Sequence, residues 1–260
     1  MRTHRRKIRV LLFLILFSGL FNFVSSVFAS DDLIEVPAVV GMAPRVGFDD
    51  NDEVLFVLHG SLPNFCYEVG PTKVERDPLS SAVITLRQYA RKKADKLCVE
   101  EAILPAHMKF QVPYTTEVSL GRLSAGDYIV KYQKPAGQVG IRMLSVAVAT
   151  TLSIDTQPYA ATSNAMVSDM INGLDEVKVT LNGILTNSCS ELTDEIRIER
   201  VDDVFVILPV LNIKSGVFCA QYIRPFSREL NLGRLPPGHY LAHVRSMNGK
   251  AINRVFQVAK

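Results

Sequence analysis

Two sequence motifs, each present twice and in the same order, constrain the fold of this 260-residue chain more than any other feature. An alternating segment that begins Asp-Glu-Val ends at a glycine six residues before a cysteine, at 52–66 and again at 175–189. A second motif, Leu-Gly-Arg-Leu-x-x-Gly-x-Tyr, occupies 120–128 and 232–240. Self-similarity of this kind indicates a repeated structural unit. We therefore predict a tandem duplication of two units of roughly 100 residues, a size at which small domains fold independently.

The repeats also predict the domain boundaries. We place a first domain at 30–154 and a second at 172–260, with a linker at 155–171 between them. The intervening stretch is polar and rich in small residues, a composition that is typical of linkers.

Within each unit the hydrophobic pattern has a period of two. In the second unit Val177, Val179 and Leu181 alternate with polar residues. The segment that begins at Tyr240 shows the same alternation, except that Leu241 is apolar where a polar residue would be expected. Such alternation indicates strands with one buried and one solvent-facing side. With recurrent turn signals and about seven short strands per unit, the predicted fold class is all-β, as two tandem immunoglobulin-like antiparallel β-sandwiches.

The four cysteines allow three disulfide connectivities. A duplication selects the pairing within each unit, Cys66–Cys98 and Cys189–Cys219, because only that pairing could precede the duplication. A loop of about 30 residues closed in this way stabilises a domain by about 3–4 kcal/mol in the chain-entropy model. The alternative is a set of reactive or metal-binding thiols, although the spacing is not Cys-x-x-Cys.

Residues 1–29 have the layout of a secretory signal peptide. A basic segment, 1–9, precedes an apolar run, 10–24, and Val27 and Ala29 suit the −3 and −1 positions of a signal peptidase site. We predict export, periplasmic or secreted, with cleavage after Ala29 and no membrane span afterwards; an uncleaved anchor is the alternative.

Without the five basic residues of 1–9 the chain has 24 basic and 26 acidic residues. This charge balance argues against nucleic acid as a partner.

The second unit carries a longer pattern. Gly183 precedes Cys189 by six residues, Cys219 precedes Pro225-Phe226 by the same spacing, and Leu-Gly and Gly-x-Tyr follow. This pattern resembles that of a recurrent exported bacterial β-sandwich domain of unassigned function. The first unit keeps the frame but has Leu-Pro-Ala at 104–106 in place of Pro-Phe. The resemblance implies fold and compartment, and it assigns no catalytic residue.

A basic segment just before Cys98 is the best charged candidate for binding; it comprises Arg87, Tyr89, Arg91, Lys92, Lys93 and Lys96. Such a segment suits an acidic partner, for example a uronic glycan or an anionic lipid. The alternative is a solvated hairpin tip. The second unit has the apolar run 204–211 in the corresponding region. We expect this run to be buried against the other domain or an inner sheet face, or else to dock a partner strand.

His239 and His243 are four residues apart on a predicted strand and therefore share a face, where two imidazoles could help bind a metal. Their counterparts in the first unit are Asp127 and Lys131. We therefore predict a solvent-facing side that tolerates any polar residue, with no metal site. The acidic cluster at 49–53 could bind Ca²⁺, but we expect solvated side chains at a strand end.

The sequence contains no nucleotide-binding, zinc-protease or serine-hydrolase motif, so we predict no enzyme and no cofactor. The expected function is an exported cell-envelope or secreted module that binds a protein or glycan through loops at the sandwich ends. The alternative is an exported protease inhibitor, in which a disulfide-braced loop, Ser61–Phe65 or Ile184–Ser188, occupies a protease cleft.

Overall fold

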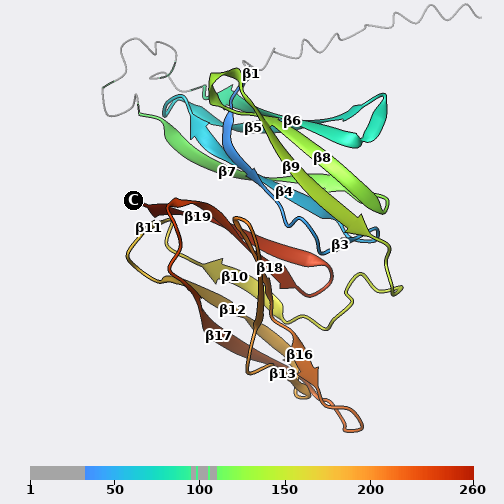
Figure 1. Cartoon of the computed structure of the whole chain (residues 1–260). Coiled ribbons are helices and arrows are strands. Elements are labelled where there is room, and N and C mark those ends of the chain that lie inside the picture. The colour runs from blue at the N-terminus through green and yellow to red at the C-terminus, as the bar shows by residue number, and fades with distance from the viewer. Residues whose placement is uncertain (1–32, 95–97, 99–104, 106–109) are drawn as a thin grey trace, which may run out of the picture. The chain divides into compact units, whose positions relative to one another are not determined.

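The computed structural model describes residues 33–94, 98, 105 and 110–260 (Figure 1). Their regular structure is almost entirely β-strand, with a short 3₁₀-helix at Pro135–Gly137, so the predicted fold class is confirmed. No helix in this part of the chain is long and apolar enough to cross a membrane. The predicted signal peptide, its cleavage site after Ala29, and Lys96 lie outside the described residues.

The first sandwich consists of two sheets. One has the strand order β1-β6-β8-β9-β3, with β5 also paired to β6, and the other has the order β2-β4-β7. The strands are β1 (Leu33–Glu35), β2 (Ala38–Met42), β3 (Phe48–Asp49), β4 (Val54–Leu62), β5 (Tyr67–Asp77), β6 (Ser80–Lys92), β7 (Val112–Gly121), β8 (Gly126–Gln133) and β9 (Val139–Ala147).

The second sandwich has sheets of order β11-β19-β18-β15-β14 and β10-β12-β17, and a small β13-β16 pair at one end. The strands are β10 (Ala161–Met166), β11 (Met170–Asn172), β12 (Val177–Asn187), β13 (Ser190–Leu192), β14 (Arg197–Val201), β15 (Val204–Leu208), β16 (Leu211–Ile213), β17 (Gln221–Gly233), β18 (Gly238–Ser246) and β19 (Lys250–Ala259).

Both sandwiches use the same pairing scheme. A hairpin, β5–β6 or β14–β15, places its second strand parallel to β8 or β18. A short strand, β3 or β11, lies parallel to the last strand, β9 or β19. The remaining pairings are antiparallel, as predicted. The alternating pattern did not reveal the four parallel pairings, because side chains alternate with the same period in either kind of sheet.

Part of the stretch predicted as a linker forms strands instead. β10 lies within 155–171 and β11 begins there, and each adds one strand to one of the two larger sheets of the second sandwich. Ala165 of β10 and Ile171 of β11 belong to the hydrophobic core. The composition suggested a linker because β10 reaches the core through side chains as small as Ala165.

The repeated motifs build the two separate cores. Alternate residues of β4 and of β12 enter them, Val54, Phe56 and Leu58 in the first and Val177, Val179 and Leu181 in the second. The Gly-x-Tyr part of the second motif forms a tyrosine corner: the hydroxyl donates a hydrogen bond to a carbonyl four residues earlier, Tyr128 to Ser124 and Tyr240 to Pro236, each at 2.8 Å.

The disulfides join Cys66 to Cys98 and Cys189 to Cys219, as predicted, one in each sandwich. The turn before each first cysteine is also repeated. The side-chain oxygen of Asn64 accepts the backbone N–H of Cys66 at 2.8 Å, and that of Asn187 accepts the N–H of Cys189 at 2.9 Å.

A third hydrophobic cluster lies at the junction of the two sandwiches. It combines Met42 and Val57 of the first sandwich with Leu241 of β18 and with alternate residues of β15: Val204, Val206 and Leu208. The other β15 side chains, Phe205 and Ile207, enter the second core. The expectation that this apolar run is buried against the other domain is therefore confirmed for 204–208.

Candidate functional site

The predicted basic segment lies mainly along β6 rather than at a hairpin tip. Arg87 and Arg91 are exposed on the outer face of this strand. The Arg87 guanidinium is 3.3 Å from Glu35 and 3.4 Å from Glu75, and the first carboxylate is the main cause of a raised pKa of Arg87. Arg91 lies 4.0 Å from Glu68. The Lys93 ammonium stacks over the Phe65 ring at 4.1 Å.

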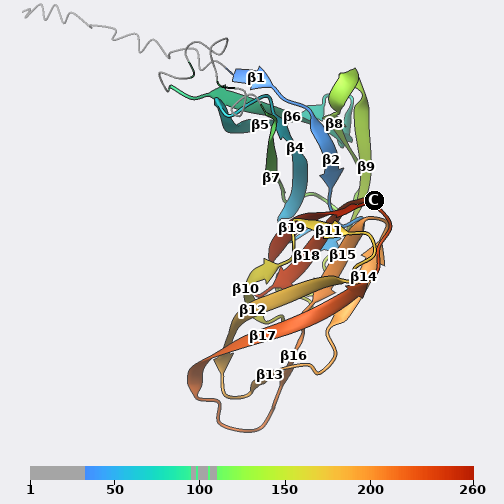
Figure 2. The ribbon, with the colours of Figure 1, turned by 90° about the vertical axis from the view of Figure 1, so that its left-hand side faces the viewer.

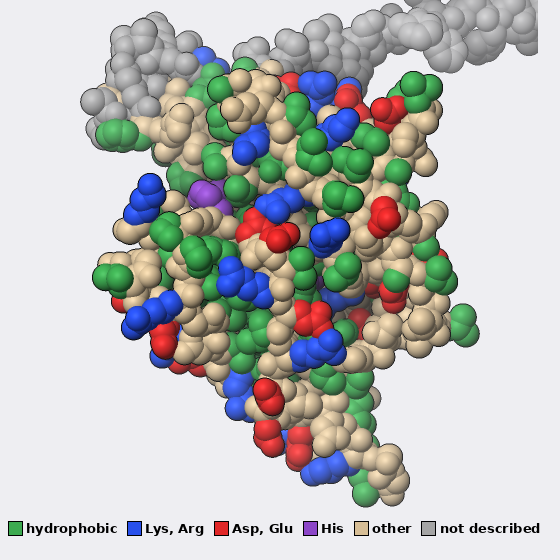
Figure 3. Space-filling view, in the orientation of Figure 1, with side chains coloured by type: hydrophobic (Ala, Val, Ile, Leu, Met, Phe, Trp, Pro, Cys, Tyr) green, Lys and Arg blue, Asp and Glu red, His purple; other side chains and the backbone are tan. Residues whose placement is uncertain are grey.

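Paired charges are also the rule on the face of the molecule drawn in Figure 3, where Lys and Arg side chains are interspersed with Asp and Glu. The neighbour of Arg87 on β5, Lys73, is itself 2.7 Å from Glu75. A single-sign field, which would attract a polyanion, is therefore absent around Arg87. Lys96 falls outside the described residues.

The prediction of a solvent-facing histidine pair is wrong for His243. His239 and His243 do share a face of β18, but this face lies at the junction, and His243 is buried. Its ring packs edge-on against Phe48 of the first sandwich, with centroids 5.9 Å apart, and its Nδ1 lies 2.7 Å from Asn253 Oδ1. Desolvation lowers the pKa of His243 to about 4. The neutral ring therefore contributes to the packing of the junction and is not a solvent-facing polar group.

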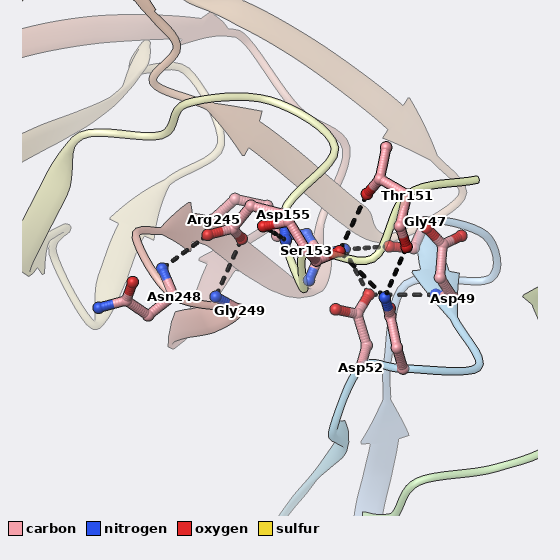
Figure 4. A network of polar contacts seen from close by, with 10 residues as sticks. Gly47, Asp49, Asp52, Thr151, Ser153, Asp155, Arg245, Asn248 and Gly249 are labelled. Carbon is pink, nitrogen blue, oxygen red and sulfur yellow. Dashed lines mark hydrogen bonds and ion pairs between the residues drawn. The ribbon is translucent and has the colours of Figure 1, made fainter. Parts of the chain in front are cut away.

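Arg245 follows on the same face of β18 and forms an ion pair across the junction (Figure 4). Its Nη2 is 3.0 Å from Asp52 Oδ2 and also donates to the carbonyl of Gly47. Asp52, which is buried, accepts the backbone N–H of Asp49 at 3.1 Å as well. One member of the acidic cluster at 49–53, Asp52, is thus part of the junction. Among the described residues, no group of three or more His, Cys, Asp or Glu side chains could hold a metal ion.

The connection between the sandwiches is anchored on both sides, as Figure 4 shows. The Asn51 amide of the first sandwich donates to the carbonyl of Ser153 at 3.0 Å. The Asp155 carboxylate accepts the backbone N–H groups of Asn248 and Gly249 in the second, at 2.7 and 2.9 Å. Through these bonds the connecting segment around 153–155 is fixed to both sandwiches.

A second histidine pair, which the sequence did not predict, joins His59 of β4 to His239 of β18. The ring centroids are 5.4 Å apart and the planes are tilted by 46°. His59 Nδ1 lies 2.9 Å from Thr115 Oγ1, whereas His239 Nδ1 is buried and has no hydrogen-bond partner among the described residues. Desolvation lowers the pKa of both rings, and the nearby His239 lowers that of His59 further. Both imidazoles are therefore neutral at pH 7.

These two rings line a cavity of about 330 Å³. One wall is a row across three neighbouring strands, in which Gln257 of β19 is in register with both Met170 of β11 and His239 of β18. The opposite wall holds His59 and its register partner Thr115 of β7. The cavity is completed by Pro113, Tyr114, Asp169, Val255 and Phe256.

The strands β13 and β16 lie at one end of the second sandwich (Figures 1 and 2). Several exposed apolar side chains belong to β16, to the start of β17 and to the segment around Cys219 between them. We call this surface the distal end; it comprises Ile213, Val217, Phe218, Tyr222 and Ile223. Phe218 is 93% exposed, and Ile223 is 69% exposed. The disulfide, the β13–β16 pair and the last β12–β17 pairs hold these segments together.

A further apolar stripe lies on the outer face of the first sandwich. Val139, Ile141 and Met143 alternate along β9 with their side chains exposed, and Ile129 of β8 is the register partner of Met143. The stripe and the distal end are two separate candidate docking surfaces, one on each sandwich.

The two loops proposed for protease inhibition are partly strand. Ser61 and Leu62 belong to β4, and Leu62 is buried. The second loop, 184–188, lies almost entirely within β12, where β10 and β17 flank it. The part of the first loop that lies outside strands is 63–65.

Comparison with known proteins supports the sandwich fold of the second half. Residues 179–258 match the family model described as the ORF11 beta-sandwich domain. The matched segment extends from β12 to β19 and includes the distal end, Cys189 and Cys219. No curated protein and no solved structure gave a significant match.

Proposed function

We propose that this chain is an exported, non-catalytic binding module whose second sandwich docks a protein partner through the distal end. The observation that carries the proposal is the exposed group around Phe218 and Ile223. Large apolar side chains that face water can mark interaction sites, and aromatic residues commonly anchor such interfaces.

The charges around the distal end favour a protein over an acidic glycan. Lys214 is 2.9 Å from Glu191, and Arg224 donates to the carbonyl of Ser190 at 3.2 Å. These basic groups already have partners, so the surface offers apolar contacts with a polar rim, the usual anatomy of a protein interface.

Three features support export and duplication. Residues 1–29 resemble a signal peptide, and two disulfides suit an oxidising compartment. The shared pairing scheme, tyrosine corners and asparagine turns are what a tandem duplication would leave in both halves. The fused sandwiches would then hold the distal end at a fixed distance from the first domain.

Site-specific photo-crosslinking in cells that export the protein tests this proposal. A crosslinker at Phe218 should give a discrete protein adduct, and Ile223→Ser should abolish it. Leu79, which is 96% exposed at the β5–β6 turn, is the matched control position and should give no such adduct. Equal adducts from both positions, or none from Phe218, would refute the proposal.

The same variants separate the alternatives. Inhibition of a protease panel that survives Ile223→Ser would favour an inhibitor acting through 63–65. Adducts from Met143 in place of Phe218 would move the docking surface to the β9 stripe.

A further inference from the structure

The cavity between β4 and β18 contains three donor groups that the proposed docking surface does not use. They are the imidazoles of His59 and His239 and the thioether of Met170. The unpartnered, buried Nδ1 of His239 is the most unusual of them, because a buried polar atom normally has a hydrogen-bond partner in a folded protein.

The separation of the two rings suits a shared metal ion. A metal–imidazole nitrogen distance is about 2.0–2.1 Å, which places the ring centre about 3.2 Å from the ion. Two ring centres that are 5.4 Å apart are therefore close enough for one ion to contact both imidazoles.

The third donor lies on the same sheet face as His239. Met170 and His239 flank Gln257 on either side, in register, so their side chains are directed to the same side of the sheet. Asp169 also lines the cavity, but no group of three His, Cys, Asp or Glu side chains forms among the described residues. Tyr114 is engaged, because its hydroxyl donates to the Pro37 carbonyl at 3.2 Å.

This donor set selects among metals. Thioether sulfur is a soft ligand that favours monovalent copper, and imidazole also suits copper, whereas Ca²⁺ and Mg²⁺ require oxygen ligands. A structural zinc site would need four ligands from His, Cys, Asp or Glu. The site is open to solvent: Met170 is 66% exposed, and His59 and His239 are half-buried.

We propose that the junction cavity binds one monovalent copper ion through His59, His239 and the Met170 thioether. The ion would join β4 of the first sandwich to β18 and β11 of the second, and it would stabilise the junction.

Anaerobic titration of the exported chain with Cu(I), in competition with a chromogenic chelator, tests this site. We expect one ion per chain. His59→Asn and His239→Asn should each weaken binding by more than about tenfold, and Met170→Leu should weaken it less. Asparagine occurs at the position of the second sandwich that matches His59, Asn182, so the first variant should fold. Copper should also shift the NMR signals of both histidine rings.

A matched control removes a methionine elsewhere. Met166→Leu on β10 should leave the affinity unchanged. The proposal is overturned if no Cu(I) binds, if the His59 and His239 variants bind like the parent chain, or if Zn²⁺ binds more tightly than Cu(I). Ile223→Ser should not alter copper binding, so this result is independent of the partner experiment.

Discussion

Strands β8 and β18 occupy the same place in the two sandwiches, yet their outward faces meet different surroundings. On β8 this face carries Asp127, Ile129, Lys131 and Gln133, and each of these side chains is at least partly exposed. On β18 the same positions are His239, Leu241, His243 and Arg245, which lie at the junction. A shared strand order therefore fixes the core face of a strand, but the neighbouring domain determines whether its other face is solvated.

The largest expected difference in the free energy of unfolding is between a variant of Arg245 and a variant of its counterpart Gln133. Arg245→Gln leaves the buried Asp52 carboxylate without its ion pair, which should lower the free energy of unfolding by about 4 kcal/mol. Gln133→Arg, on an exposed face, should change it by less than about 0.5 kcal/mol. Urea denaturation of both variants checks this prediction, and similar losses for the two would refute it.

A smaller contrast is expected between Leu241 and Ile129. Leu241 is fully buried in the junction cluster, so Leu241→Ala should cost about 3 kcal/mol through lost burial and a cavity. Ile129 is 36% exposed, and Ile129→Ala should cost less than about 1 kcal/mol. Thermal unfolding would show a clear loss of Tm for the first variant alone. Equal shifts would mean that the two faces have the same surroundings.

The smallest effects should be equal in both sandwiches, because they probe the shared frame. Tyr128→Phe and Tyr240→Phe each remove one corner hydrogen bond of 2.8 Å. Each should lower the free energy of unfolding by about 1 kcal/mol. Losses that differ by more than about 1 kcal/mol would show that the two corners are not equivalent.

The sequence predicted several features that are determined within one unit, namely strands and disulfides. Period-two segments such as 177–181 specified strands, and the position of Cys66 and Cys189 in the frame specified the disulfides, because both reflect local geometry or pairing within one unit.

Besides the parallel pairings and the strands β10 and β11, the sequence did not predict the contacts between the units. His59 and His239 come from non-equivalent strands, β4 and β18, so comparing one repeat with the other could not bring them together. The one available signal was Leu241, an apolar residue on an otherwise polar face, together with the continuous apolar run of β15. Both are typical of strands that are covered on two faces.

The most direct test of the junction is an NMR titration of the His243 imidazole. Because burial lowers the folded-state pKa below the ordinary value of 6.5, the stability due to neutral His243 is fully present above about pH 6.5. It is lost as the pH falls toward 4, by up to about 3 kcal/mol. We predict a pKa of about 4 for this ring in the folded chain. A pKa near 6.5 would show that the face is solvated, and it would contradict the account.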